Sequence, residues 1–164
     1  MKRFLIVIGV AVMLSMVMVP AASAADMIVV ATKATFKKAQ PWVDFLKSKE
    51  VPVKNVLPSE FAKYQGEPYV VLLGGMDEAG GIKDLLKKAL TPEEFAWITT
   101  AGNKKMYTKF NVWTGGQEVM IFAAADGPGA EAVRKENRDE WWETISEWFE
   151  LEEDEAGEGG TPAY

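Results

Sequence analysis

The chain has 164 residues, 48% of them hydrophobic and 26% charged, and it contains no cysteine and no histidine. The lack of cysteine excludes disulfides, thiolate nucleophiles, iron–sulfur clusters and cysteine-ligated zinc. The lack of histidine excludes a Ser-His triad and imidazole metal ligands. Any catalysis would depend on Asp, Glu, Lys, Tyr or Ser, with at most an oxygen-ligated metal ion. Because no catalytic motif is recognisable, we expect no enzymatic activity and no cofactor.

The first 24 residues have the pattern of a secretory signal peptide. Lys2 and Arg3 precede an apolar run over residues 4–19, and residues 20–24 end in an Ala-x-Ala cleavage pattern. The 16 residues of this run span roughly 24 Å as a helix, less than the ~30 Å hydrocarbon core, which favours cleavage over retention as an anchor. We therefore expect an exported protein of the extracellular, periplasmic or pseudoperiplasmic cell envelope, without stable membrane insertion after cleavage.

Removal of the signal peptide makes the chain more acidic. Lys2 and Arg3 leave with it, so 16 basic residues remain against 24 acidic ones and the net charge falls from −6 to −8. Residues 139–164 hold ten acidic residues and no basic one, and from Leu151 the chain has little to bury. We predict a disordered acidic tail over residues 151–164. The scattered basic residues give no support for nucleic-acid binding.

Residues 25–150 alternate between strand and helix patterns, which predicts a single α/β domain. Residues 27–31 are a short β-branched apolar run, typical of a buried parallel strand. A helical stripe follows over residues 36–46, and Pro41 lies either in its first turn or at a bend. The remaining predicted elements are a strand at 51–56, a helical turn at 58–64, a strand at 69–73, a helix at 82–89, a short helix from Thr91, a hairpin of 106–113 with 118–124, and a last helix at 130–149 that includes Asn137.

These elements predict a three-layer α/β/α sandwich, flavodoxin- or Rossmann-like, with about five strands that are mostly parallel. We expect a flavodoxin-like order for the first three strands and an antiparallel edge strand at 106–113. In such sheets, ligands bind outside the carboxyl ends of the strands, where the strand order reverses. The candidate ligand-binding residues are therefore those that follow the first, third and last strands: Thr32, Lys33, Gly74, Gly75, Asp77, Asp126 and Gly127.

More specific chemistries are open at three places. Glycine-rich residues 74–81 could present N–H groups to a phosphate, although glycine also permits the positive φ of a tight turn. The carboxylates of Asp77, Glu78 and Asp126 could share a hard cation, or be ordinary solvated acids. A basic cluster could be a solvated strand face, or could bind an anionic surface or the acidic tail; it consists of Lys104, Lys105 and Lys109.

Several short motifs occur along the domain: Pro58-Ser59-Glu60-Phe61, residues 69–75, residues 102–107 with 109–113, Gly116-Gln117, and residues 123–126 with Glu136-Asn137-Arg138. Together these motifs resemble the S-layer-type α/β domain of archaeal exported proteins. Asp126-Gly127 stands where we expect an Asp-Arg pair from this pattern. The resemblance implies an exported, non-enzymatic cell-envelope or S-layer-associated interaction domain that binds envelope proteins or itself. The alternative is an extracytoplasmic protein that binds a small ligand or a divalent cation through the loops at the strand ends.

Overall fold

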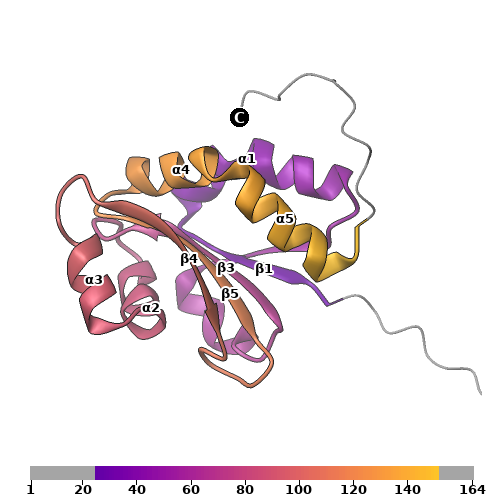
Figure 1. Ribbon diagram of the computed structural model, residues 1–164, viewed down its shortest axis with the longest axis horizontal. Helices are drawn as coiled ribbons and strands as arrows, with labels where there is room; N and C mark the ends of the chain where they lie inside the picture. Colours follow the sequence, from indigo (N-terminus) through magenta and orange to yellow (C-terminus); the bar gives the residue numbers. More distant parts are fainter. Residues whose placement is uncertain (1–24, 152–164) are drawn as a thin grey trace, which may run out of the picture.

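The computed structural model describes residues 25–151 (Figure 1); the signal peptide predicted at 1–24 and the acidic tail beyond Leu151 lie outside these residues. Leu151 itself packs against the core, so the packed part of the chain reaches this residue. In chain order the elements are β1 (Met27–Val30), α1 (Lys33–Ser48), β2 (Val53–Val56), the 3-10 helix η1 (Pro58–Tyr64), β3 (Tyr69–Gly75), α2 (Ile82–Ala89), α3 (Pro92–Ile98), β4 (Lys104–Phe110), β5 (Glu118–Ala124), α4 (Gly127–Glu136) and α5 (Arg138–Phe149).

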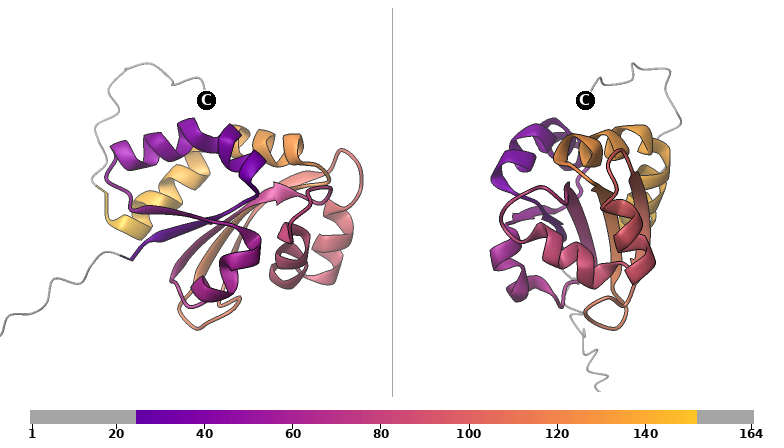
Figure 2. Two further views of the ribbon diagram at one scale, coloured as in Figure 1. Left: turned by 180° about the vertical axis from the view of Figure 1, so that it is seen from behind. Right: turned by 90° about the vertical axis from the view of Figure 1, so that its left-hand side faces the viewer.

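The five strands form one sheet in the order β2-β1-β3-β5-β4. Only the pair of β4 and β5 is antiparallel, and β4 lies at an edge. Both the predicted α/β class and the predicted antiparallel edge strand are confirmed. Figure 2 shows α1, α4 and α5 on one face of the sheet, with η1, α2 and α3 on the other.

The strands supply side chains to a hydrophobic core on each face, because successive residues of a strand point to opposite sides. Val29 belongs to the core under α1, α4 and α5, whereas Ile28 belongs to the core under η1, α2 and α3. The first core is rich in aromatic rings, and Trp42 makes edge-on contacts with Phe122 at 6.1 Å and with Trp141 at 5.8 Å. Within residues 25–151, no helix has both the length and the apolar character needed to cross a membrane.

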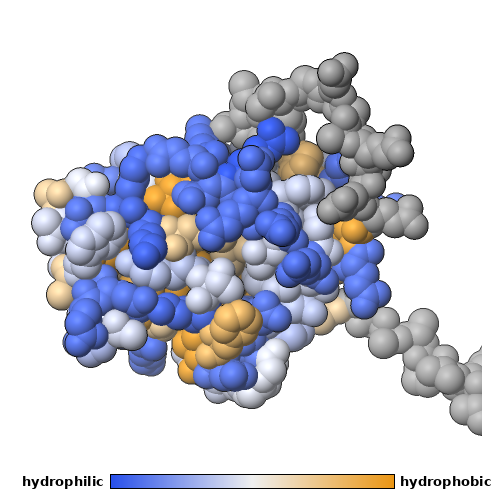
Figure 3. All heavy atoms as spheres, viewed as in Figure 1, coloured by the Kyte–Doolittle hydropathy of each residue, from blue (hydrophilic) through white to orange (hydrophobic). Residues whose placement is uncertain are grey.

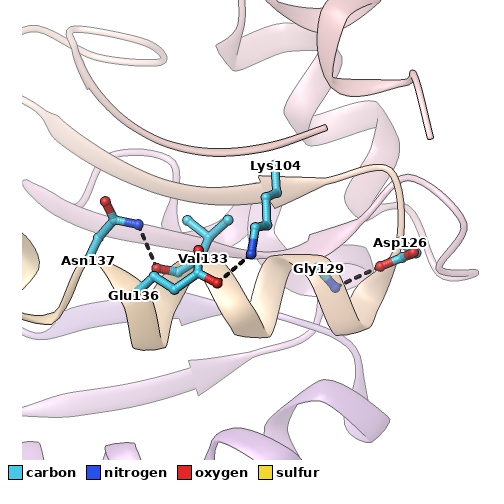
Figure 4. A network of polar contacts seen from close by, with 6 residues as sticks. All are labelled: Lys104, Asp126, Gly129, Val133, Glu136 and Asn137. Atoms are coloured by element: carbon cyan, nitrogen blue, oxygen red, sulfur yellow. Dashed lines mark hydrogen bonds and ion pairs between the residues drawn. The ribbon is translucent and has the colours of Figure 1, made fainter. Parts of the chain in front are cut away.

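The last helix differs from its prediction, since it is two helices, α4 and α5, that meet at Asn137. Asn137 has φ −104° and ψ 36°, outside the helical region, and its Nδ2 donates to the Val133 carbonyl at 2.8 Å (Figure 4). Asparagine side chains compete with the backbone for such bonds, which favours a helix end. α4 also begins before residue 130, because the Asp126 carboxylate accepts the N–H of Gly129 at 2.6 Å.

Two further boundaries differ from the sequence pattern. α1 begins at Lys33, where the hydroxyl of Thr32 caps it by accepting the N–H of Thr35 at 3.3 Å. The helix continues through Pro41. The edge strand ends at Phe110 because Asn111 has φ 57° and turns the chain. The Asn111 side chain accepts the N–H of Gly116 at 2.6 Å and closes the hairpin loop.

Candidate functional site

The loops that follow β1, β3 and β5 meet at one edge of the sheet. These strands are parallel neighbours, so their carboxyl ends lie together, as the sequence predicts. The hydroxyl of Thr32 donates to Oε2 of Glu78 at 3.0 Å, which joins the first loop to the second. The N–H of Gly127 donates to Oδ1 of Asp77 at 3.0 Å, which joins the second loop to the third.

Glu78 holds its carboxylate against the N-terminus of α1. The hydroxyl oxygen of Thr35, a buried residue, lies 2.8 and 2.9 Å from the two carboxylate oxygens. α1 has no acidic residue in its own first turn, so Glu78 supplies the negative charge that a helix N-terminus favours. Anionic ligands occupy this kind of position in other α/β sheets. Here a carboxylate of the chain itself fills it.

Glycines allow the loops to approach this closely. A Cβ on Gly75 would overlap the backbone at Asp126 and Gly127, and a Cβ on Gly127 would overlap the carboxylate of Glu78. The second overlap is with the end of a flexible side chain, so a side chain at position 127 would displace the Glu78 carboxylate. Positive φ values occur in this loop only at Gly80 and Gly81, so Gly75 is required by close approach and not by a turn.

The acidic residues proposed as cation ligands are each engaged by the protein. Asp77 binds the N–H of Gly127, Glu78 binds two threonines, and Asp126 caps α4 (Figure 4). Among residues 25–151, no group of three or more acidic side chains is placed to hold a metal ion. The geometry therefore gives Asp77, Glu78 and Asp126 structural roles.

A pocket of about 220 Å³ lies beside these loops, at the ends of β1 and β2. It is lined by Thr32, Lys33, Leu57, Pro58, Ser59, Ala79 and Gly80. Of the candidate ligand-binding residues, Thr32 and Lys33 line this pocket, whereas Gly74, Gly75, Asp77, Asp126 and Gly127 do not. Lys33 and Ser59 are the polar residues of its lining besides Thr32, which is bonded to Glu78. The volume fits only a small ligand.

A second candidate surface surrounds the outer edge of β4. Two large hydrophobic side chains are exposed in the described part of the chain, Trp97 at 45% and Phe110 at 63%. Phe110 ends β4, and Trp97 lies on α3, which is held to β4 by an ion pair of 2.6 Å between Glu94 and Lys109. Figure 3 shows apolar atoms gathered over the lower end of the β4–β5 hairpin. We call the outer edge of β4, with Lys105, Thr108 and Phe110, and with Trp97 of α3 beside the start of the strand, the β4 edge surface.

The basic cluster is only partly free. Lys104 pairs with Glu136 of α4 (Figure 4), and Lys109 pairs with Glu94. Lys105 is exposed, has no acidic partner among residues 25–151, and lies 5.2 Å from the ring centre of Tyr107. One of the three predicted cationic residues is therefore left without a counter-charge.

Electrostatics tie α3 to the edge strand. Burial raises the pKa of Glu94, but hydrogen bonds from Lys109 and from the Thr91 backbone, with the charge of Lys109, outweigh burial and leave this pKa below its usual value of 4.5. Burial raises the pKa of Tyr107 above 10.0, and the nearby charge of Glu94 raises it further. At neutral pH Glu94 is therefore a carboxylate and Tyr107 a neutral phenol.

Sequence patterns missed one buried ion pair. Arg134 is 2% exposed, its guanidinium binds both carboxylate oxygens of Glu131, and it lies 5.3 Å from the ring centre of Trp42. Glutamate and arginine three residues apart are neighbours on a helix, but this spacing does not reveal burial. The pair lies between α1 and α4 and is part of the core.

Comparisons with protein-family models, with curated proteins and with solved structures find no match to this chain.

Proposed function

We propose that this chain is an exported, non-enzymatic interaction domain of the cell envelope that binds its partner through the β4 edge surface. The signal-peptide pattern of residues 1–24 and the resemblance to S-layer-type domains support export to the envelope. The observation that carries the proposal is the placement of Trp97 and Phe110. Both exposed large hydrophobic side chains of the described residues lie on β4 or on the helix held against it.

Such a surface is suited to a partner because its apolar side chains are unfavourably exposed to water. Exposed apolar side chains beside an open strand edge favour association with another chain. Burying Phe110 and Trp97 in an interface would remove their apolar area from water, and aromatic residues contribute strongly to binding. A binding role also agrees with the strand-end carboxylates, which accept hydrogen bonds within the domain.

Site-specific crosslinking in the cells that make the protein tests this proposal. A photoreactive amino acid in place of Phe110 should crosslink the chain to an envelope component. The same amino acid in place of Lys38, an exposed residue of α1, is the matched control and should not. Recovery of the protein only as a free soluble monomer, with no crosslink from position 110, would contradict the proposal.

A second candidate function is the binding of a small anion in the pocket at the ends of β1 and β2. The observation that favours it is that Lys33 and Ser59 line the pocket while Glu78 is bonded to Thr32 and Thr35. Two residues with donor side chains are therefore part of the pocket lining. Carboxylate, phosphate and sulfate ions are the probes for calorimetric titration.

Replacement of Lys33 tests the pocket directly. Lys33→Met should abolish binding of the anion, and Lys37→Met, on the next turn of α1, should leave it intact. Millimolar calcium or magnesium should not change the melting temperature, because the nearby carboxylates are engaged. Absence of anion binding at millimolar concentration, or equal binding by both variants, would contradict the candidate.

A further inference from the structure

We infer that the β4 edge surface binds an extended acidic segment of a partner protein, which adds to the sheet as a sixth strand. This inference rests on the proposed function and gives its partner a chemical class and a mode of binding. Addition of a strand supplies backbone hydrogen bonds for affinity, and alternate side chains supply specificity.

The register of the hairpin shows which backbone groups are open. Asn103 accepts the N–H of Ala125 at 3.2 Å, and Asn111 donates to Gln117 at 2.7 Å. In an antiparallel ladder every second residue bonds to the neighbouring strand, so residues 105, 107 and 109 bond to β5. Residues 104, 106, 108 and 110 point their N–H and C=O groups outward, and no segment of residues 25–151 pairs with them.

The open edge is long enough for a stable strand. β4 has seven residues, which span about 24 Å, whereas β2 at the opposite edge has four. Figures 1 and 2 show helices beside each face of β4 and no element of the described chain along its outer edge. Short edges protect a sheet against added strands, so β4 is the edge that can accept one.

Side chains beside this edge select an acidic, alternating segment. Lys105 and Lys109 lie on the face of β4 that carries α3, together with the buried ring of Tyr107. Thr108 and Phe110 lie on the other face and are exposed. Carboxylates on one face of an added strand would meet Lys105, the lysine of this face that has no acidic partner among residues 25–151, and apolar side chains on its other face would cover Phe110.

The same lysines disfavour a second copy of this chain as the occupant. Antiparallel pairing of two β4 strands centred on Tyr107 would set Lys105 of one copy directly opposite Lys109 of the other. Like charges directly opposite each other destabilise a strand pair. In this register Lys105 would gain no counter-charge, because the lysine opposite it is already paired with Glu94, whereas a carboxylate of another chain would supply one.

Hydrogen exchange of the full chain, measured by NMR, provides the test. The probe is a seven-residue peptide of alternating valine and glutamate, and the control peptide has lysine in place of glutamate. The acidic peptide should slow exchange at the outward amides of Met106, Thr108 and Phe110 at least about tenfold, as expected for newly bonded amides. The lysine peptide should leave these rates unchanged. Protection of none of the three amides, or equal protection by both peptides, would overturn the inference.

Variants of β4 test whether strand addition causes the amide protection by the acidic peptide. Thr108→Pro removes an outward N–H, which an edge strand tolerates, and should weaken binding of the acidic peptide at least about tenfold. Thr108→Val keeps the N–H and should bind as the unaltered chain does. If the proline variant unfolds, Lys105→Glu provides the test instead. It should lose binding of the acidic peptide, whereas Lys83→Glu on α2 should retain it. Unaltered binding by Lys105→Glu would overturn the inference.

The result also separates this inference from the proposed function. Crosslinking from position 110 without amide protection by the acidic peptide would leave the interaction domain standing and refute strand addition. Absence of both would refute both. A dimer in sedimentation that Thr108→Pro converts to a monomer would show self-pairing and would likewise overturn the inference.

Discussion

At the scale of single residues, Gly75 and Gly127 bring the loops at the strand ends into contact. Each lies where a Cβ atom would overlap a neighbour, the backbone at Asp126 in one case and the carboxylate of Glu78 in the other. Neither residue has a positive φ, so backbone conformation does not require glycine at either position. Gly75 is needed for space because it faces packed backbone, whereas a Cβ at position 127 would displace the Glu78 carboxylate. The hydrogen bonds of Asp77 and Glu78 depend on this close approach.

Gly75→Ala should lower the free energy of unfolding by about 3 kcal/mol, because packed backbone cannot move aside as a flexible side chain can. Gly66→Ala is the matched control, since a Cβ there meets nothing within 4 Å. That variant should be neutral or more stable by up to about 1 kcal/mol, because it restricts the unfolded chain. Urea denaturation checks both variants. Equal stability of the two would contradict the assignment of close approach at Gly75.

The ion pair of Glu94 and Lys109 should make the free energy of unfolding depend on pH in the acidic range. The pKa of Glu94 is lowered in the folded state, so its contribution is present above the unfolded value, about 4.5, and is lost as the pH falls through the folded value. Glu94→Gln should therefore be less stable than the unaltered chain at pH 7. Below pH 4.5 the variant should lose less stability than the unaltered chain does. Melting temperatures from pH 7 to pH 3 check this. Parallel curves for the variant and the unaltered chain would contradict it.

At the scale of elements, α3 shows how a short helix is fixed. The hydroxyl of Thr91 accepts the N–H of Glu94 at 3.2 Å, and the Glu94 carboxylate accepts the N–H of Thr91 at 2.9 Å. The same carboxylate binds Lys109 of β4, so the cap also positions α3 against the edge strand. The spacing of Thr91 and Glu94 is that of a capping box, whereas the contact of Glu94 with β4 has no signal in the local sequence.

Thr91→Ala should destabilise the protein by about 1 kcal/mol, the usual effect of losing an N-cap. Thr91→Ser retains the hydroxyl and should remain within about 0.5 kcal/mol of the unaltered chain. The alanine variant should also speed amide exchange in α3 more than in α2. Equal stability of the serine and alanine variants in urea denaturation would show that the cap does not fix α3.

Helices and strands were predicted where hydrophobic spacing determines them, as in β3 and α2. The break at Asn137 was missed because its position fits the apolar stripe, and only the bond to Val133 reveals the end of α4. The end of β4 was missed because alternation continues past Phe110, whereas the turn depends on the φ of Asn111. Local conformations of single asparagines therefore set boundaries that periodicity does not show.

At the scale of the whole molecule, one sheet joins two cores. β1, β3 and β5 contribute to both, so loss of packing on one face should weaken the other. The sequence predicted the edge of the sheet where loops meet, since topology determines it. It did not predict that Glu78 would fill the anion position, or that Phe110 would remain exposed. Those features depend on contacts between segments far apart in the chain.

Leu86→Ala should lower the free energy of unfolding by about 3 kcal/mol, because Leu86 is fully buried and the change leaves a cavity. Since the sheet is shared, slowly exchanging amides of α5, on the opposite face, should lose the same protection as those of α2. Lys88→Ala, at an exposed position of the same helix, should change neither. Loss of protection in α2 alone would show that the two faces unfold independently.

The contact between Gly127 and Glu78 has a consequence for the evolution of this domain. Two positions separated by 49 residues share one small space, so a side chain gained at position 127 would displace the Glu78 carboxylate from Thr32 and Thr35. Among related sequences, we expect these two positions to covary: arginine at 127 should accompany a small residue at 78, and glutamate at 78 should accompany glycine at 127. Lineages of the first kind would expose the N-terminus of α1 and could acquire an external anion there. The residues at positions 78 and 127 would then determine whether the loops at the strand ends stabilise the domain or bind a ligand.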